Sequence, residues 1–217
     1  NVFPYFLPTK YSSKQSRIDS NVLCKNLGVK LTEFSIEDLR TNIEVSLTPL
    51  FDKKKKDSTE ENLQSRIRGL ILMALSNKTN SMLLATGNKS EYAVGYATLY
   101  GDMCGGFALL KDIYKTKVYE LCNWINNNTF LYSDTPDEII PKNIITKEPT
   151  AELKFNQKDT DSLPPYEVLD KILELLIDKN KDLQSIVKKG YDKELVRKVW
   201  LMIKNSEFKR YQSVVGP

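Results

Sequence analysis

Residues 81–91 read Ser-Met-Leu-Leu-Ala-Thr-Gly-Asn-Lys-Ser-Glu, a short apolar run that stops at a glycine and continues into polar residues. A continuous apolar run of this length is typical of a strand buried on both faces. Small and apolar residues then recur at roughly helical spacing, at Ala93, Val94 and Ala97. The stretch therefore predicts a strand, a turn at Gly87 and a helix. In open α/β sheets such turns form the ligand crevice.

The segments on either side alternate between strand and helix patterns. Further apolar strands are predicted at residues 2–7, 29–36 and 107–110. This alternation argues for an α/β fold with a parallel sheet covered on both sides. Helices are predicted before Gly28, after one of the capping candidates at residues 57–59, through residues 118–125, and at residues 166–177, 183–189 and 193–204. Prolines and polar residues at 136–165 predict a long loop, which we expect to be mobile.

The composition is that of an ordinary globular protein with one well-buried core. The 217 residues are 41% hydrophobic and 28% charged, and one domain is the simplest count. The net charge of +4 fits a protein that handles small anions and falls short of a nucleic-acid-binding signature. No apolar run approaches the roughly 20 residues of a membrane span, and we expect no signal peptide. We expect a cytoplasmic protein that binds neither membranes nor nucleic acid.

The cysteines exclude two kinds of structural site. Cys24, Cys104 and Cys122 are too few and too irregularly spaced for a disulfide framework, and without histidine they make no zinc site. This favours a reducing compartment. The run of lysines at residues 53–56 predicts a solvated loop, because like charges repel.

Two carboxylates and a lysine near the turn could bind phosphate and metal. Glu91 and Asp102 lie eleven residues apart, so both could face one crevice only if the chain bends near Gly101. Magnesium prefers carboxylate oxygens and usually keeps phosphates as further ligands. Lys115 could add a point charge for a transferring phosphate. Alternatively, Glu91 is an exposed helix residue, Asp102 a turn residue and Lys115 a surface lysine.

Three other positions carry weaker signals, each with an ordinary alternative. Asn62 and Arg66 share one face of a predicted helix and are either a polar binding cluster or solvated helix residues. Asp159 and Asp161 either offer acceptors to a metal or lie in a plain linker. Lys209 and Arg210 either bind an anion or form a basic tail.

Four separated motifs in one order carry a resemblance to a known family. They are Ala-Thr-Gly-Asn-Lys-Ser-Glu at 85–91, Gly-Tyr-Ala-Thr-Leu-Tyr-Gly-Asp at 95–102, Glu-Pro-Thr-Ala-Glu-Leu at 148–153 and Asp-Ser-Leu-Pro-Pro-Tyr at 161–166. With the closing Phe-Lys-Arg at 208–210, the chain resembles the synthetase domain of NAD synthetases, most closely the glutamine-dependent bacterial form. The resemblance implies a Rossmann-like parallel sheet of the adenine-nucleotide alpha-hydrolase or ATP-pyrophosphatase type, with a helical C-terminal part. It also implies that residues 1–217 are part of one amidating ligase domain.

The resemblance further implies an ATP-dependent ligase for NAD biosynthesis. ATP adenylates the nicotinate carboxylate of deamido-NAD, and ammonia, supplied from glutamine, then displaces AMP to give NAD and pyrophosphate. A carboxylate resists nucleophilic attack, whereas an acyl adenylate has a stabilised leaving group, and magnesium and cations offset phosphate charge. The family also implies a homodimer or higher homo-oligomer.

Site roles carry over residue by residue from the matched motifs. Lys115 and Asp102 are the implied catalytic residues, and Glu91 and Asp161 the implied magnesium ligands. The implied ATP contacts are Thr86, Lys115, Ser12 and Ser13. The implied deamido-NAD contacts are Asn62, Arg66, Asp102 and Lys209.

One departure from the family pattern shapes our expectation for this chain. The family's glycine-rich Ser-Gly-Gly-x-Asp-Ser pyrophosphate loop does not occur in the 217 residues, and no cysteine has the context of a glutaminase nucleophile. We therefore expect the C-terminal part of a longer enzyme, weak or inactive alone. Two alternatives stay open: another ATP-pyrophosphatase amidotransferase or ligase, and a non-catalytic dinucleotide-binding or assembly fragment.

Overall fold

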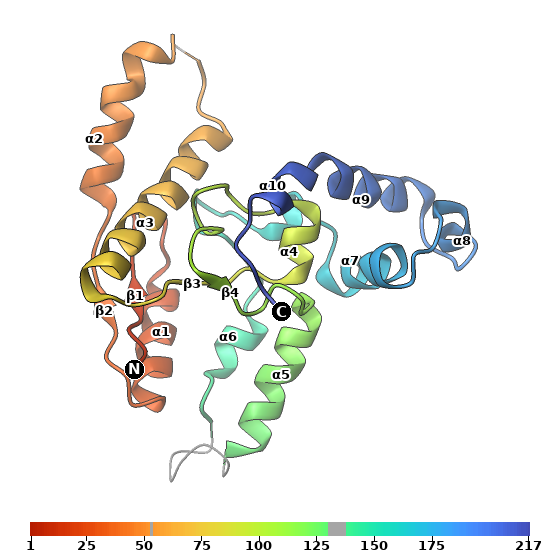
Figure 1. Ribbon diagram of the computed structural model, residues 1–217, viewed down its shortest axis with the longest axis horizontal. Coiled ribbons are helices and arrows are strands. Elements are labelled where there is room, and N and C mark those ends of the chain that lie inside the picture. The colour runs from red at the N-terminus through yellow and green to blue at the C-terminus, as the bar shows by residue number, and fades with distance from the viewer. Residues whose placement is uncertain (53, 130–137) are drawn as a thin grey trace. The chain divides into compact units, whose positions relative to one another are not determined.

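The computed structural model describes residues 1–52, 54–129 and 138–217 (Figure 1). These residues group into two compact units. Unit 1 comprises residues 1–67 and 118–162, and unit 2 comprises residues 68–117 and 163–217. Each unit contains one pair of parallel strands and several helices, as expected for an α/β fold. The single domain expected for the whole chain stays a prediction.

The strands of unit 1 are shorter than the sequence pattern suggests. β1 (Tyr5–Phe6) pairs in parallel with β2 (Thr32–Glu33). Single backbone hydrogen bonds continue the pairing at both ends, including one of 3.0 Å from the Ile36 amide to the Pro8 carbonyl. Ile36 is completely buried and anchors the end of this segment.

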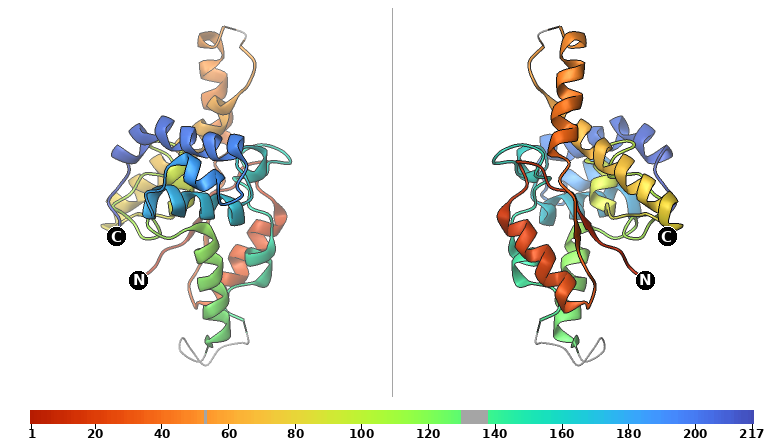
Figure 2. Two further views of the ribbon diagram at one scale, coloured as in Figure 1. Left: turned by 90° about the vertical axis from the view of Figure 1, so that its right-hand side faces the viewer. Right: turned by 90° about the vertical axis from the view of Figure 1, so that its left-hand side faces the viewer.

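Short helices make up most of the regular structure of unit 1. The bounds are α1 Lys14–Asn26, α2 Glu37–Leu47, the 3₁₀ turn η1 Thr48–Leu50, the first part of α3 Ser58–Thr79, most of α5 Lys115–Asn127, α6 Lys142–Thr146 and the 3₁₀ turn η3 Asp159–Asp161. Figure 2 shows α1 and α6 side by side, and the amide of Asn143 on α6 donates to Asp19 on α1 at 2.5 Å. The α1 face that bears Ile18 and Val22 is exposed.

Helix α2 was not predicted from the sequence. Its buried Arg40 donates to Glu37 at 2.5 Å and also pairs with Glu44, one turn further on. Acidic residues at Glu37 and Asp38 favour the positive end of a helix, so they were a usable signal. The exposed Lys56 pairs with Glu44 at 2.7 Å. The described lysines 54–56 are exposed, as predicted, and Lys53 lies outside the described residues.

The described part of the predicted loop at 136–165 contains only α6 and η3 as regular structure, and residues 136 and 137 lie outside the described residues. Side chains of α3 form hydrogen bonds and an ion pair with the backbone and side chains of this loop. Gln64 donates to the Leu153 carbonyl at 2.8 Å, and Glu61 accepts from Gln157 at 3.0 Å and pairs with Lys154 at 3.1 Å. The mobility of this loop stays a prediction.

A carboxylate from this loop caps helix α1. Glu152 accepts hydrogen bonds from the Ser13 amide at 3.0 Å and the Ser16 hydroxyl at 2.7 Å, and pairs with Lys147 at 2.7 Å. Burial would raise the pKa of Glu152, but the hydrogen bonds from Lys147, Ser16 and Ser13 lower this pKa to about 2. The Glu152 backbone is left-handed, with a φ of 51°, so these contacts hold an uncommon conformation for a glutamate.

Unit 2 combines a second strand pair with a helical core. β3 (Leu84–Ala85) runs parallel to β4 (Phe107–Ala108), with Leu84 opposite Phe107 and Ala85 opposite Ala108. The helices are the rest of α3, α4 Lys89–Val94, the start of α5, α7 Tyr166–Leu173, the π-helical turn η4 Glu174–Asp178, α8 Leu183–Val187, α9 Lys193–Asn205 and α10 Glu207–Tyr211. The three predicted C-terminal helices are thereby confirmed within about two residues at their ends.

The core of unit 2 lies among α4, α7, α8 and α9, which appear together in Figure 1. Ala93 and Val94 of α4 pack against completely buried aliphatic residues of the other three helices. Each such side chain contributes roughly 1.5–3 kcal/mol when fully buried. These residues are Leu169, Ile172 and Leu173 of α7, Ile186 of α8, and Val196 and Val199 of α9.

The Glu152 contacts predict acid-dependent loss of stability. Because the folded-state pKa lies below the ordinary value of 4.5, the stabilisation is complete above about pH 4.5 and is lost as the pH falls towards 2. In Glu152→Gln this contribution is missing at every pH. We expect wild type to exceed the variant by about 1–2 kcal/mol in unfolding free energy at pH 7, with allowance for partial exposure.

Urea unfolding at several pH values between 2 and 7 measures this difference. The gap between the two proteins should shrink as the pH falls below 4.5. Lys154→Met is a matched control, because it removes an exposed lysine of the same loop that pairs elsewhere. A pH-independent gap for Glu152→Gln would contradict the prediction.

Candidate functional site

The turn after β3 has the strand-turn-helix form that the sequence predicts. Asn88 precedes α4 and its side chain accepts from the Glu91 amide at 3.1 Å, while Glu91 accepts from the Asn88 amide at 3.2 Å. This reciprocal capping box satisfies two donors at the start of the helix. A Cβ at Gly87 would lie 2.7 Å from the Tyr92 ring, so a larger residue there would displace the ring or the backbone. The turn is therefore closely packed, with Glu91 held in one place.

Glu91 and Lys115 lie next to each other in unit 2. The Lys115 ammonium is 3.2 Å from a Glu91 carboxylate oxygen, and both side chains are about one-fifth exposed. The same ammonium lies 5.5 Å from the centre of the Tyr166 ring. The reading of both residues as freely exposed surface charges is therefore wrong. The residues that resemble a magnesium ligand and a phosphate contact form one ion pair.

The start of α5, which carries Lys115, is held by side chains from α4 and α7. Ser90 accepts from the Lys115 amide at 2.9 Å and donates to Asp170 at 2.5 Å. Asp170 also accepts from the Thr116 amide at 2.9 Å. Sequence reasoning missed Ser90 and Asp170. One signal existed, because Asp170 is a carboxylate four residues after Tyr166 on the apolar face of an amphipathic helix.

Residues 95–102 form a loop after α4. Asp102 belongs to this loop, and Lys209 donates hydrogen bonds to it. Asp102 is exposed and accepts from the Thr98 amide at 2.9 Å. Lys209 of α10 donates to the carbonyls of Gly95 and Ala97 at 2.8 and 2.7 Å. The chain turns just before Gly101, with Tyr100 in the left-handed region at a φ of 62°. Thr86 is exposed at the end of β3.

Tyr92 lies buried beside this site with an unpaired hydroxyl. Among the described residues its hydroxyl has no hydrogen-bond partner. Burial, together with the nearby charges of Asp102 and Glu91, raises the pKa of Tyr92 to about 12. Lys111 lies 5.7 Å from the ring centre. The hydroxyl therefore remains protonated at neutral pH.

The remaining predicted site residues belong to unit 1. Ser12 accepts from the Thr9 amide at 3.1 Å, and Ser13 caps α1 by accepting from the Ser16 amide at 3.0 Å. Exposed Asp161 accepts from the Lys158 amide at 3.0 Å in the turn η3. Asn62 and Arg66 lie one turn apart on α3, as predicted. Unit 1 thus contains Ser12, Ser13, Asn62, Arg66 and Asp161, whereas unit 2 contains Thr86, Glu91, Asp102, Lys115 and Lys209.

The acidic residues can contribute to a magnesium site without forming one alone. Within residues 1–52, 54–129 and 138–217, no group of three or more histidine, cysteine, aspartate or glutamate side chains could hold a metal ion. Magnesium often binds through one or two carboxylates and completes its ligands with water and substrate phosphates. Glu91 fits this use, because it is one fixed carboxylate beside a cation that also favours phosphate. In the same ranges, no helix has the length and apolarity that crossing a membrane requires.

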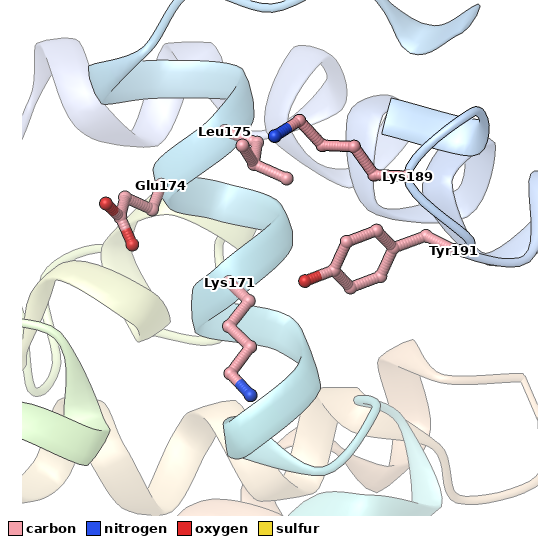
Figure 3. Close-up of a pocket in the computed structure, with 5 residues that line it drawn as sticks. All are labelled: Lys171, Glu174, Leu175, Lys189 and Tyr191. Carbon is pink, nitrogen blue, oxygen red and sulfur yellow. The ribbon is translucent and has the colours of Figure 1, made fainter. Parts of the chain in front are cut away.

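A separate open pocket of about 430 Å³ lies beside α7 and η4. Figure 3 shows Tyr191 and Lys189 directed towards α7, and the Glu174 carboxylate directed away from Tyr191. None of the predicted site residues lines it. Its residues are Lys171, Glu174, Leu175, Lys189 and Tyr191.

Comparison with known proteins identifies similar sequences over the whole chain. The profile of a family described as NAD synthase matches residues 1–213. The chain is 49% identical to the glutamine-dependent NAD(+) synthetase of Rhodobacter capsulatus, over 100% of this chain and 40% of that protein. It is also 49% identical to the enzyme of the same description from Thermotoga maritima, over 100% and 36%. The chain thus spans about two-fifths of the length of these relatives.

Solved structures with similar folds carry the same description. A glutamine-dependent NAD+ synthetase from Acinetobacter baumannii in complex with ADP is 42% identical with a TM-score of 0.63, over 100% of this chain and 37% of that one. A glutamine-dependent NAD(+) synthetase from Cytophaga hutchinsonii has a TM-score of 0.79 at 21% identity, over 99% and 35%. The second likeness concerns the fold alone. Together they confirm the predicted Rossmann-like fold class.

The unpaired Tyr92 hydroxyl predicts a stabilising substitution. A buried polar group without a partner costs about 1–3 kcal/mol. We expect Tyr92→Phe to raise the unfolding free energy by about 1 kcal/mol or more. The matched control is Tyr114→Phe, because the Tyr114 hydroxyl donates to Asp178 at 2.9 Å. That variant should lose about 1 kcal/mol. Chemical denaturation of both variants measures these changes in unfolding free energy, which should have opposite signs. A destabilised Tyr92→Phe would contradict the prediction.

Proposed function

This chain belongs to the NAD synthase family, and on that premise we propose that the protein containing it makes NAD from deamido-NAD, ATP and ammonia. The reaction also gives AMP and pyrophosphate. The observation that carries the proposal is the Glu91 and Lys115 pair at the turn of residues 86–91. It sets a cation for phosphate beside a carboxylate suited to magnesium. The ADP complex of the Acinetobacter baumannii relative supports an adenine nucleotide as ligand.

The proposed chemistry explains why ATP is needed. The nicotinate carboxylate of deamido-NAD is a poor acyl donor, because its negative charge repels nucleophiles and its oxygen leaves badly. Attack of this carboxylate on the α-phosphorus of ATP forms the acyl adenylate and releases pyrophosphate. Ammonia then attacks the acyl carbon, AMP leaves, and one proton is lost as the amide forms.

Lys115 has the clearest role in the first step. Its ammonium sits on the first residue of α5, where the helix dipole adds partial positive charge. A cation held before the reaction stabilises the charge that develops on the departing pyrophosphate. Its pairing with Glu91 and its place over Tyr166 restrict the ammonium to a small region. Lys115 is thus preorganised for phosphate.

The other residues receive binding roles. Glu91 holds magnesium together with ATP phosphates, and when bound this ion neutralises phosphate charge. Following the family motifs, we assign Asp102 and Lys209 to the deamido-NAD side; the exposed Asp102 lies on the loop to which Lys209 donates hydrogen bonds. Thr86 is assigned to ATP. In unit 1 the corresponding assignments are Ser12 and Ser13 to ATP, Asn62 and Arg66 to deamido-NAD, and Asp161 to magnesium.

The wider setting is part of the same proposal. The glutamine-dependent relatives support glutamine as the source of ammonia. We assign the protein to the cytoplasm, which agrees with three free cysteines, and propose a homodimer or higher homo-oligomer. Size-exclusion chromatography with light scattering measures the latter.

Product formation tests the proposed reaction. The full-length protein with deamido-NAD, ATP, magnesium and either glutamine or ammonium should form NAD, AMP and pyrophosphate in equal amounts by chromatography. Omitting deamido-NAD should abolish AMP formation. Xanthylate and aspartate serve as alternative acceptors of the adenylyl group. AMP formation with one of these, but not with deamido-NAD, would assign the chain to a different ligase reaction.

Two substitutions at Glu91 separate its binding role from its structural role. Glutamine can complete a capping box, so Glu91→Gln should keep the helix cap and lose the charge. Glu91→Ala should also lose about 1 kcal/mol of stability. We expect both variants to form NAD at least about 100-fold more slowly at low magnesium, in line with loss of a transition-state electrostatic contact.

A magnesium titration of the rate is the decisive measurement for Glu91. Partial rescue at high magnesium is expected if the carboxylate binds the ion. Glu120→Gln, an exposed position on α5, serves as a control of the same chemical change. Wild-type rates and magnesium dependence in Glu91→Gln would show that Glu91 only caps the helix.

A further inference from the structure

A buried carboxylate on α7 has an unusual position. Asp170 is 5% exposed and lies on the same helix as the completely buried Leu169 and Leu173. A charge in such a place is tolerated only when hydrogen bonds compensate for lost hydration. Each oxygen of Asp170 accepts one hydrogen bond, from the Ser90 hydroxyl at 2.5 Å and the Thr116 amide at 2.9 Å. The carboxylate is therefore satisfied by groups on two other helices.

In these contacts, side chains of other helices accept hydrogen bonds from the first backbone amides of helix α5. The first amides of a helix have no partner within it. Here the Lys115 amide donates to Ser90 at 2.9 Å and the Thr116 amide donates to Asp170. The negative charge of Asp170 also lies at the positive end of α5. The position of the first turn of α5 thus depends on Ser90 and Asp170.

The acceptors at the start of α5 come from distant parts of the sequence. The residue before α5 is Tyr114, whose hydroxyl donates to Asp178 at 2.9 Å. The acceptors for the first two amides come from residues 25 and 54 positions away in sequence. Ser90 also directly precedes Glu91 in α4. One hydrogen-bonded unit therefore locates the backbone of Lys115 relative to that of Glu91.

We infer that Asp170 is a positioning residue for the reaction, acting through Ser90 and the α5 amides to hold the Lys115 ammonium where the phosphates of ATP bind. The inference rests on the proposed function, because it takes ATP as the ligand of Lys115. Asp170 itself touches no reacting atom. Its loss should affect ATP more than deamido-NAD, because Lys115 is assigned to ATP.

The test combines single and double variants of the full-length protein. Asp170→Asn has nearly the same shape, but it removes the charge and leaves one accepting oxygen in place of two. We expect about a tenfold rise in the KM and dissociation constant for ATP, within the range for loss of a group that orients a ligand-binding side chain. The KM for deamido-NAD should stay within about twofold. Ser90→Ala should act in the same direction.

A double-mutant cycle shows whether the effect passes through Lys115. Calorimetric titration with ATP gives dissociation constants for Lys115→Met and for the double variant Lys115→Met with Asp170→Asn. These two should agree within about twofold, because Lys115→Met has already removed the ammonium that Asp170 positions. In thermal unfolding, Asp170→Asn should lower the midpoint by the same amount in the wild type and in Lys115→Met.

The matched control is Asp192→Asn, a substitution of the same kind at the start of another helix, α9. Asp192 accepts from the Leu195 amide at 2.8 Å. Asp192→Asn should leave the ATP dissociation constant unchanged.

The outcomes separate the two proposals. An active protein in which Asp170→Asn leaves ATP binding unchanged, or weakens it equally with and without Lys115, would overturn the positioning role alone. Equal increases in KM for both substrates would also overturn it, since they indicate general loosening. A wild-type protein that neither binds ATP nor forms NAD would overturn the proposed function and this inference with it.

Discussion

The site in unit 2 depends on satisfying the backbone amides at the starts of two helices. Helix α4 has six residues, too short to be stable alone in water. Its capping box, formed by Asn88 and Glu91, and the packing of Ala93 and Val94 into the core hold it in place. The first amides of α5 are satisfied by Ser90 of that same helix and by Asp170 of α7. If α4 shifted, Glu91 and the start of α5 would shift with it.

This constraint explains why a charged site can exist beside a hydrophobic core. The apolar side chains of α7, α8 and α9 supply most of the burial, and Asp170 is the polar exception on α7 that reaches towards the site. Burying a carboxylate is unfavourable unless hydrogen bonds compensate. Arrangements that leave the buried carboxylate without donors are therefore strongly disfavoured. The cost of a misplaced Asp170 therefore restricts α4, α5 and α7 to one arrangement. Hydrophobic packing alone is less selective, because it is not directional.

Much of the local structure could be predicted from the sequence, because it follows from short-range patterns. The apolar run and Gly87 indicated the strand and turn, and Asn88 marked the start of α4. Helix periodicity located the C-terminal helices. Strand lengths were overestimated because the apolar pattern extends beyond the residues that find a partner strand. Helix α2 was missed because its buried residue is Arg40, which no search for apolar periodicity selects, although its acidic first turn was visible.

The site was predictable only where neighbours in sequence are neighbours in space. Glu91 and Lys115 were both candidates from the residues near the turn, but the sequence could not show that their side chains pair. Ser90 and Asp170 are 80 positions apart, so their hydrogen bond has no local sequence signature. A carboxylate on the apolar face of a helix was the usable sign. Such a residue needs partners from elsewhere, and in α7 those partners are the first residues of the helix that carries Lys115.

Glu91 shows how one side chain can serve stability and binding together. Its carboxylate accepts the Asn88 amide through one oxygen and faces Lys115 with the other. A capping role requires only an acceptor, whereas pairing with Lys115 or a metal requires charge. The helix cap fixes the carboxylate before any ligand arrives, so little conformational freedom is lost on binding. Lys115 also loses little conformational freedom on binding, because its backbone amide donates to Ser90 and its ammonium is directed at Glu91. The contacts that form the first turns of α4 and α5 therefore also place the charged pair of Glu91 and Lys115.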